Sequence, residues 1–269
     1  MPMIENQRHG FQIPQDVHYL NCGYMSPLAI EVSDAIAAGA KLKASPWSYK
    51  PADFFSYCEH FRDRAAAIMG APSDCMAIIP SASYGLAVAA NNIPLERSQQ
   101  IVVLADQFPS NLYIWREKAA EDGAEIVTVV RDENAAWTNA VLDAIGKDTA
   151  IVAVPNCHWA DGRLVDLVTV GAKCREYGAA LVLDLTQSLG ALPINLEAIQ
   201  PDFAIAACYK WLMGPYGIGM LYAAPRYHDG KPIEYSWINR AGSEDFARLV
   251  DYRDDYQPGA RRFDMGEKS

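Results

Sequence analysis

The chain has 269 residues, 51% of them hydrophobic, and a formal net charge of −10, so it can bury a sizeable core and shows no Lys/Arg block typical of a nucleic-acid-binding surface. No apolar run is long enough to span a bilayer, and the N-terminus lacks the basic and apolar segments of a secretory signal, which argues against a membrane or secreted protein. Six scattered cysteines, with no CxxC pair and no histidine at metal-ligand spacing, indicate free thiols in a reducing cytoplasm and no metal site.

Apolar runs alternate with amphipathic stretches along most of the chain. Helices are predicted at 27–42, 52–69, 86–90, 110–122, 135–145 and 164–177. Apolar, often β-branched runs predict strands at 75–79, 101–104, 125–130, 150–154, 180–183, 203–207 and 218–222. Continuous apolar strands that alternate with helices imply a mostly parallel sheet with helices on both faces. The fold class is therefore α/β, a three-layer α/β/α arrangement.

Glycines follow three of these predicted helices directly. Gly123, Gly146 and Gly178 stand where a left-handed residue often closes a helix, so each is expected to cap the helix before it. After residue 222 the alternation degrades into a Tyr-, Arg- and Asp-rich stretch with two predicted turns, at 228–231 and 257–259. The large α/β domain is therefore expected to end near residue 240.

A lysine at the end of an apolar strand is the most informative feature. Lys210 follows the strand at 203–207 and opens a Gly-rich turn. Because burying an ammonium group is costly, a lysine that must be neutral part of the time, to form an imine with a carbonyl cofactor, suits this position. Asp184 ends another apolar strand, where a carboxylate can keep a ring nitrogen protonated. Together the two residues predict pyridoxal 5'-phosphate (PLP) as the cofactor.

Three sequence blocks then resemble the class V aminotransferase family: Leu183-Asp-Leu-Thr-Gln187, Pro201-Asp-Phe203, and Tyr209-Lys-Trp-Leu-Met-Gly-Pro-Tyr-Gly-Ile-Gly219. This family belongs to the fold-type I PLP enzymes and includes cysteine desulfurases, kynureninases and isopenicillin N epimerase-like proteins. The resemblance implies that 45–240 is the large PLP-binding domain. It also implies that 1–44 and 241–269 belong to a smaller domain that is largely absent, so the chain looks truncated.

The resemblance assigns roles to the residues around the lysine. Lys210 matches the lysine that forms the imine and moves the Cα proton, and Asp184 matches the carboxylate that faces the pyridine nitrogen. Gln187 matches the residue near the phenolic oxygen of the cofactor, although a glutamine that starts a helix would look the same. Tyr209 resembles the phosphate-binding tyrosine of kynureninases.

The phosphate group is expected at the helix that follows the first strand of the sheet. Ser81, Ala82 and Ser83 lie at this helix start, where free NH groups and the positive end of the helix dipole attract anions. Both serines are also explained as helix N-caps. The resemblance is what marks the segment as a phosphate site.

Three further residues are cofactor-binding candidates on the resemblance. Phe108 resembles the phenylalanine that stacks on the cofactor in kynureninases, which have Asp where this chain has Asn111. His158 either hydrogen-bonds the phenolic oxygen or is an ordinary loop histidine. Trp237 resembles an aromatic residue that reaches the cofactor from the neighbouring subunit, and it could equally be a tryptophan used for packing.

The predicted function is a PLP-dependent enzyme that acts on an amino acid or related amine by aminotransferase or lyase chemistry. A kynureninase-like hydrolase, an isopenicillin N epimerase-like epimerase and an inactive PLP-fold fragment are also consistent with the sequence. A desulfurase lacks support, because no cysteine follows Cys208 in the late region that would supply the nucleophile. The expected partners are a small amino-acid substrate and a second copy of the chain in a homodimer, without nucleic acid or membrane.

Overall fold

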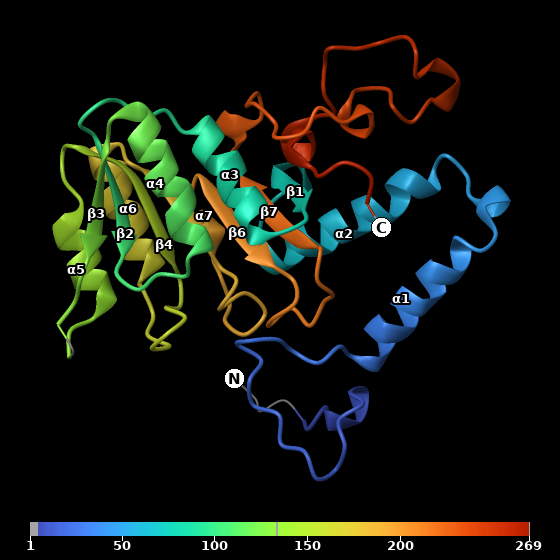
Figure 1. Cartoon of the computed structure of the whole chain (residues 1–269), viewed down its shortest axis with the longest axis horizontal. Helices are drawn as coiled ribbons and strands as arrows, with labels where there is room; N and C mark the ends of the chain where they lie inside the picture. Colours follow the sequence, from blue (N-terminus) through green and yellow to red (C-terminus); the bar gives the residue numbers. More distant parts are fainter. Residues whose placement is uncertain (1–4, 133, 269) are drawn as a thin grey trace.

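The computed structural model describes residues 5–132 and 134–268, and a seven-stranded sheet forms the centre of the described part (Figure 1). The strand order is β1-β7-β6-β5-β4-β2-β3. Every neighbouring pair is parallel except those of β7, which runs antiparallel to β1 and β6. The strands are β1 (Met76–Ile79), β2 (Gln100–Leu104), β3 (Glu125–Val129), β4 (Thr149–Pro155), β5 (Ala180–Asp184), β6 (Phe203–Ala207) and β7 (Gly219–Ala223). The predicted mostly parallel sheet is confirmed.

Helices cover both faces of the sheet. The helices of the described part are α1 (Ile30–Leu42), α2 (Asp53–Met69), α3 (Ala82–Asn92), α4 (Ser110–Asp122), α5 (Trp137–Ala144), α6 (Leu167–Tyr177) and the short α7 (Leu196–Ile199), and all of them except α1 pack on the sheet. One hydrophobic core contains residues of α2, α5, α6 and α7, and the other contains residues of α3 and α4. The strands supply apolar side chains to both cores, which is why they read as continuous apolar runs. The three-layer α/β/α fold is confirmed.

Two of the three predicted glycine caps are confirmed. Gly123 and Gly178 close α4 and α6 with φ of 72° and 73°, in the left-handed region. The expectation for Gly146 is wrong, because α5 ends at Ala144 and its cap, Ile145, is already extended. Gly146 instead lies in a turn, where its NH donates to Thr149 Oγ1 at 3.0 Å.

Strand register brings the chemically interesting segments to one edge of the sheet. Asp184, the last residue of β5, pairs with Pro155 on one side and Ile205 on the other. Gly219 of β7 pairs both with Ile79, at the end of β1, and with Ala207, at the end of β6. The segments that leave β1, β4, β5 and β6 therefore meet at the same carboxyl edge, as expected for an α/β fold.

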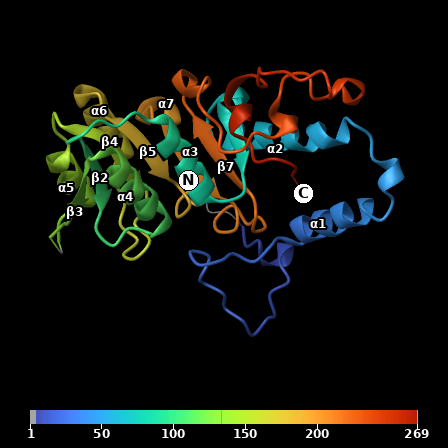
Figure 2. The same cartoon turned by 45° about the horizontal axis from the view of Figure 1, so that its top comes forward.

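The N-terminal segment extends beneath this edge, and α1 stands apart from the sheet (Figures 1 and 2). No residue of α1 is buried. The segment before α1 is attached to the edge by the Ser26 NH, which donates to the Tyr209 carbonyl at 3.1 Å. The predicted domain boundaries after 44 and 240 stay predictions, and residues 1–4 and 269 lie outside the described part.

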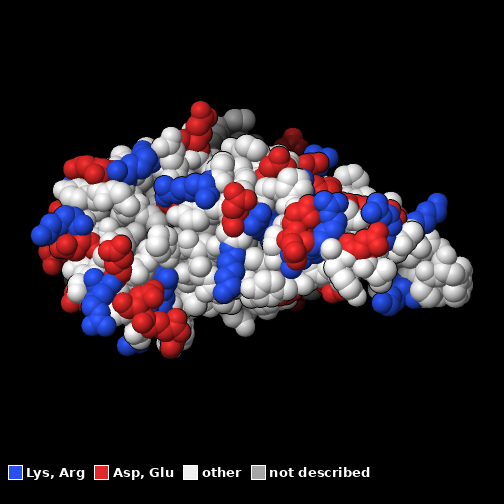
Figure 3. Space-filling model, turned by 90° about the horizontal axis from the view of Figure 1, so that it is seen from above, with Lys and Arg blue, Asp and Glu red and all other residues white. Residues whose placement is uncertain are grey.

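Acidic and basic side chains are interspersed over the face shown in Figure 3, with no large block of one sign. Among the described residues, no helix is both long and apolar enough to cross a membrane. The described part also contains no group of three or more His, Cys, Asp or Glu residues able to hold a metal ion.

A buried ion pair fastens the C-terminal segment to the body of the fold. The guanidinium of Arg62, on α2, forms a bidentate pair with Asp264, at 2.7 and 3.1 Å, and both side chains are nearly inaccessible to solvent. Asp264 Oδ1 also accepts the Ile78 NH of β1 at 2.8 Å. The 3-10 turn Gly259–Phe263, which precedes Asp264, contributes Ala260 and Phe263 to the core of the α3 and α4 face. One carboxylate thus joins α2, β1 and the chain end.

Replacing Asp264 by alanine is expected to lower the free energy of unfolding by about 3 kcal/mol, because the buried Arg62 loses its bidentate partner and keeps only the half-exposed Glu59, at 3.1 Å. Asp229→Ala is the control: Asp229 is fully exposed and pairs with Arg262 at 3.4 Å, so its loss is expected to leave the stability nearly unchanged. Urea denaturation measures both. Equal losses in the two variants would contradict the fastening role of the buried pair.

Candidate active site

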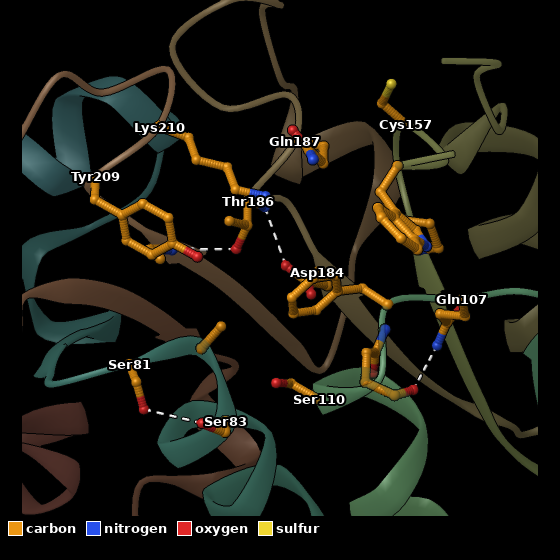
Figure 4. Close-up of a pocket in the computed structure, with 16 residues that line it drawn as sticks. Ser81, Ser83, Gln107, Ser110, Cys157, Asp184, Thr186, Gln187, Tyr209 and Lys210 are labelled. Atoms are coloured by element: carbon orange, nitrogen blue, oxygen red, sulfur yellow. Dashed lines mark hydrogen bonds between the residues drawn. The ribbon is translucent and has the colours of Figure 1, made fainter. Parts of the chain in front are cut away.

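A cavity opens at the carboxyl edge of the sheet, with about 630 Å³ of space inside it and at its mouth (Figure 4). Its walls come from the starts of α3 and α4 and from the segments that follow β4, β5 and β6. Eight of the ten residues predicted from the sequence line it: Ser81, Ala82, Ser83, Phe108, Asp184, Gln187, Tyr209 and Lys210. The fold thus brings together side chains that are more than a hundred residues apart in the sequence.

Lys210 reaches into this cavity from the turn after β6 and is only 6% exposed. Burial lowers the pKa of its amine, and the nearby Asp184 carboxylate acts in the opposite direction. The Nζ atom lies 5.3 Å from the ring centroid of Phe108 and 5.9 Å from that of Tyr209. A lysine held in this way is neutral more often than an exposed one, which favours its use as a nucleophile.

Asp184 lines the cavity from the end of β5 and is 8% exposed. Burial raises the pKa of its carboxyl group, while hydrogen bonds from Thr186 and the charge of Lys210 lower it. The Thr186 NH donates to Asp184 Oδ1 at 3.0 Å, and Thr186 Oγ1 accepts the Ala207 NH at 3.2 Å. These bonds fix the carboxylate to the β6 end. A cationic group in the cavity would stabilise its charged form.

The turn after Lys210 is tight, and two glycines permit it. A Cβ at Gly214 would lie 2.9 Å from the Cys208 Cβ, and one at Gly190 would lie 2.5 Å from the Trp211 carbonyl oxygen. Gly190 also has a φ of 98°. Any larger residue at either position would displace the turn that holds Lys210.

The α3 end of the cavity is suited to an anion. Ser81 is the N-cap of α3, and its Oγ accepts the Tyr84 NH at 3.2 Å and lies 3.1 Å from Ser83 Oγ. The first NH groups of a helix have no partner within it and carry the positive end of the helix dipole. Tyr209 lines the same cavity, and its ring stacks on Tyr216 at a centroid distance of 4.1 Å. Two hydroxyls and a helix N-terminus therefore converge where a phosphate is expected.

The segment after β2, which carries Phe108, is held by two neighbouring side chains of another loop. His158 Nε2 lies 3.1 Å from the Ala105 carbonyl oxygen, and Trp159 Nε1 donates to the Asp106 carbonyl at 2.6 Å. The Trp159 ring also meets Phe108 edge-on at 5.6 Å between centroids. Asp106 has a φ of 52°, an uncommon conformation for a residue with a side chain. The two contacts hold this loop and thereby place the Phe108 ring.

Two of the predicted residues do not line the cavity. His158 is buried behind the wall, where its ring packs on Trp137 at 4.9 Å and Nδ1 lies 3.3 Å from an Asp161 oxygen. Trp237 lies in the C-terminal part of the chain, where it contacts Phe246 and donates from Nε1 to Glu267 at 2.8 Å. Within this chain both side chains are occupied by packing and polar contacts, as an ordinary loop histidine and a packing tryptophan would be. Any direct contact of theirs with a cofactor stays a prediction.

Gln187 lines the cavity, and both ends of its amide have protein partners. Nε2 donates to the Gly23 carbonyl at 3.0 Å, and Oε1 accepts from Trp211 Nε1 at 3.3 Å. The side chain therefore connects the N-terminal segment to the turn after Lys210. One Nε2 hydrogen remains for a ligand, since an amide nitrogen carries two.

Sequence reasoning missed half of the cavity lining: Gln107, Ser110, Asn111, Pro155, Cys157, Trp159, Thr186 and Ala207. Half of them directly neighbour a predicted residue and the others lie two or three positions from one, so widening each motif by three positions would have found them. Cys157 is the cysteine among them. Burial and the nearby Asp161 raise the pKa of its thiol and make it a poor nucleophile. Figure 4 shows Cys157 and Gln187 at the end of the cavity away from Ser81 and Ser83.

The residues of the cavity fit PLP. A buried amine with a lowered pKa matches its aldehyde, and a buried carboxylate matches its ring nitrogen. An aromatic face matches its ring, and a helix N-terminus with two hydroxyls matches its phosphate. Lys210, Asp184, Phe108 and the Ser81–Ser83 segment would hold these four parts.

Comparison with known proteins places the chain among PLP-related sequences. A family model described as Aminotransferase class-V matches residues 48–236. An uncharacterized aminotransferase, YcbU of Bacillus subtilis, is 26% identical over 77% of this chain and 54% of its own length. A kynureninase of Burkholderia mallei is 26% identical over 96% of this chain and 63% of its own length.

The solved structures that resemble this chain share its fold. A lysine-to-alanine mutant of C-DES, with glycine covalently linked to its PLP cofactor, has a TM-score of 0.85 at 18% identity and covers 96% of this chain and 69% of its own. The apo cysteine desulfurase of Thermococcus onnurineus has a TM-score of 0.78 at 21% identity and covers 99% of this chain and 67% of its own. The chain spans between 54% and 63% of the length of the two curated relatives.

Trp159→Phe is expected to loosen the Phe108 loop, because the phenyl ring keeps the aromatic contact but cannot donate to the Asp106 carbonyl. Loss of about 1 kcal/mol of local stability corresponds to about fivefold faster amide hydrogen exchange over 105–111. Trp237→Phe, which removes the bond to Glu267 elsewhere, is the matched control and is expected to leave that exchange unchanged. Unchanged exchange in Trp159→Phe would show that this hydrogen bond does not hold the loop.

Proposed function

This chain belongs to the class V aminotransferase family, and on that premise we propose that it binds pyridoxal 5'-phosphate and acts on an amino acid or a related amine. Aminotransferase or lyase chemistry is the reaction class. The single observation that carries the proposal is the buried Lys210, which shares a cavity with the buried Asp184 and with the N-terminus of α3. The family match alone would not show that these groups share one cavity.

PLP supplies an aldehyde that reacts with amines and a ring that withdraws electrons from the bond to be broken. Lys210 would hold the aldehyde carbon through Nζ in the resting protein. Its position inside the cavity also allows the amine, once released, to take a proton from the substrate and return it. The lowered pKa of Lys210 supports both roles, since only the neutral amine can do either.

Asp184 would face the ring nitrogen and favour its protonated form. The Thr186 NH orients the carboxylate through Oδ1, and the carboxylate lines the cavity. Phe108 supplies an aromatic face 5.3 Å from Lys210 Nζ, on which the ring would stack. Ser81, Ser83 and the first NH groups of α3 would bind the phosphate and thereby fix the position of PLP in the cavity.

A kynureninase-like hydrolase is the second candidate. Its support is the pair of kynureninase relatives, from Burkholderia mallei and Deinococcus radiodurans, at 26% and 27% identity over 96% and 98% of this chain. The same cavity residues would also serve an epimerase, and an inactive PLP-fold protein could retain them. The proposal therefore names the substrate as an amino acid or amine and does not choose a single reaction.

We also propose that the protein works as a homodimer with its sites at the subunit boundary, in the cytoplasm. Exposed aromatic side chains in the C-terminal part, including Tyr235 at 62% and Tyr252 at 91%, support an interface there. The free state of all six cysteines supports a reducing compartment.

Lys210→Ala is expected to abolish the covalent, borohydride-reducible attachment of PLP, because no other amine lines the described cavity. Absorbance spectra and peptide mass spectrometry after borohydride reduction measure the attachment. Lys173→Ala is the control, since Lys173 lies on α6 and pairs with Glu176 at 3.5 Å. Wild-type protein without attached cofactor, or a Lys210→Ala variant with specific attachment elsewhere, would contradict the proposal.

The homodimer proposal predicts complementation between two inactive variants. Lys210→Ala lacks the amine, and Trp237→Ala lacks the aromatic residue expected to reach the neighbouring site. If sites are shared, mixed dimers contain a site with both residues and recover part of the activity. Light scattering that gives a monomer with tightly bound PLP would rule the idea out.

A further inference from the structure

Two tyrosines of the loop after β6 stack on each other beside the cavity. The ring centroids of Tyr209 and Tyr216 lie 4.1 Å apart, and the two ring planes are inclined by only 11°. Tyr209 is half-buried and lines the cavity, whereas Tyr216 is 60% exposed and belongs to neither hydrophobic core of the described part. The Tyr216 ring therefore does not serve core packing, and the ring contact that it makes is with Tyr209.

The backbone of this loop places the two residues against each other. The Cys208 NH donates to the Ile218 carbonyl at 3.1 Å, and the Gly214 NH donates to the Cys208 carbonyl at 2.8 Å. These two bonds close the base of the loop. Gly217, with a φ of 80°, has the left-handed conformation that turns the chain back toward β7. The Tyr216 ring is thereby presented to a residue at the start of the same loop.

The hydroxyl of Tyr209 is suited to donate a hydrogen bond to an anion. Figure 4 shows the Tyr209 ring pointing into the cavity, on the side where Ser81 and Ser83 lie. Burial raises the pKa of the hydroxyl, and the neighbouring Tyr216 and Asp184 act in the same direction. The hydroxyl therefore stays protonated at neutral pH and keeps its hydrogen for an acceptor.

The stack with Tyr216 restricts the orientations that are open to the Tyr209 ring. Two aromatic rings in contact attract each other beyond the area that they bury. Without Tyr216, the Tyr209 ring gains room to turn its hydroxyl away from the cavity, because one of its faces is no longer covered. A binding group that is in place for only a fraction of the time lowers the apparent affinity by that fraction.

We propose that Tyr216 is a positioning residue, whose ring holds the Tyr209 hydroxyl where it donates to the phosphate of PLP bound at the N-terminus of α3. This inference rests on the proposed function and adds to it a residue that acts through another side chain. Pyridoxal is the same molecule without the phosphate. The effect of Tyr216 is therefore confined to the ligand that carries the phosphate.

The test compares Tyr216→Ala, which removes the stacked ring, with Tyr216→Phe, which keeps it. Affinities for PLP and for pyridoxal are measured by absorbance titration. Tyr216→Ala is expected to bind PLP about fivefold more weakly than the wild-type protein and to bind pyridoxal equally well. Tyr216→Phe is expected to restore the wild-type affinity for PLP. Because Tyr216 is largely exposed, both variants are expected to fold.

The same substitution in a Tyr209→Phe background shows whether Tyr216 acts through the Tyr209 hydroxyl. Tyr209→Phe keeps the stacked ring and removes the hydroxyl, so adding Tyr216→Ala is then expected to cause no further loss of PLP affinity. Additive losses, equal losses for PLP and pyridoxal, or an unchanged PLP affinity in Tyr216→Ala would each overturn the positioning role and leave the proposed function intact. Wild-type protein that takes up neither PLP nor pyridoxal overturns the proposed function and this inference with it.

Discussion

The burial of a lysine and an aspartate in one cavity is the constraint on which the rest of the site depends. Lys210 and Asp184 lie at the ends of neighbouring parallel strands, so the sheet itself brings them together. Neither group would tolerate such burial in isolation. Thr186 offsets part of the cost by bonding the carboxylate, and the opposite charges favour each other. A ligand with both a reactive carbonyl and a cationic ring nitrogen suits this pair better than water does.

Contacts between loops hold the walls of the cavity, in addition to the bond from Gln107 Nε2 to the Ala153 carbonyl of β4 at 3.2 Å. His158 and Trp159 bind successive carbonyls of the Phe108 loop, and Gln187 binds the carbonyl of Gly23. The first two side chains come from the segment after β4, and the third comes from the segment after β5. The aromatic face beside Lys210 therefore depends on the loop after β4 as much as on its own loop.

The two ends of the chain are attached in different ways. The C-terminal segment is fastened by the buried pair of Arg62 and Asp264, which also reaches β1. The N-terminal segment is attached through a few contacts, and α1 has no buried residue. Apolar side chains on α1 and on the C-terminal loops are surfaces that a second chain or a further domain can cover.

The sequence by itself determined the sheet, the helix layers and the central chemistry. Apolar strands in alternation with helices imply a parallel sheet, and its carboxyl edge had to receive Lys210, Asp184 and the Ser81–Ser83 segment. Local patterns carry this information because strand and helix periodicity are properties of short segments. Tertiary structure alone decided that His158 binds the loop after β2 instead of lining the cavity, and that Asn111 does line it. It also decided that Trp237 packs away from the cavity of its own chain. Side-chain direction in a loop depends on which distant groups satisfy its hydrogen bonds, and such partners are not encoded in spacing along the chain.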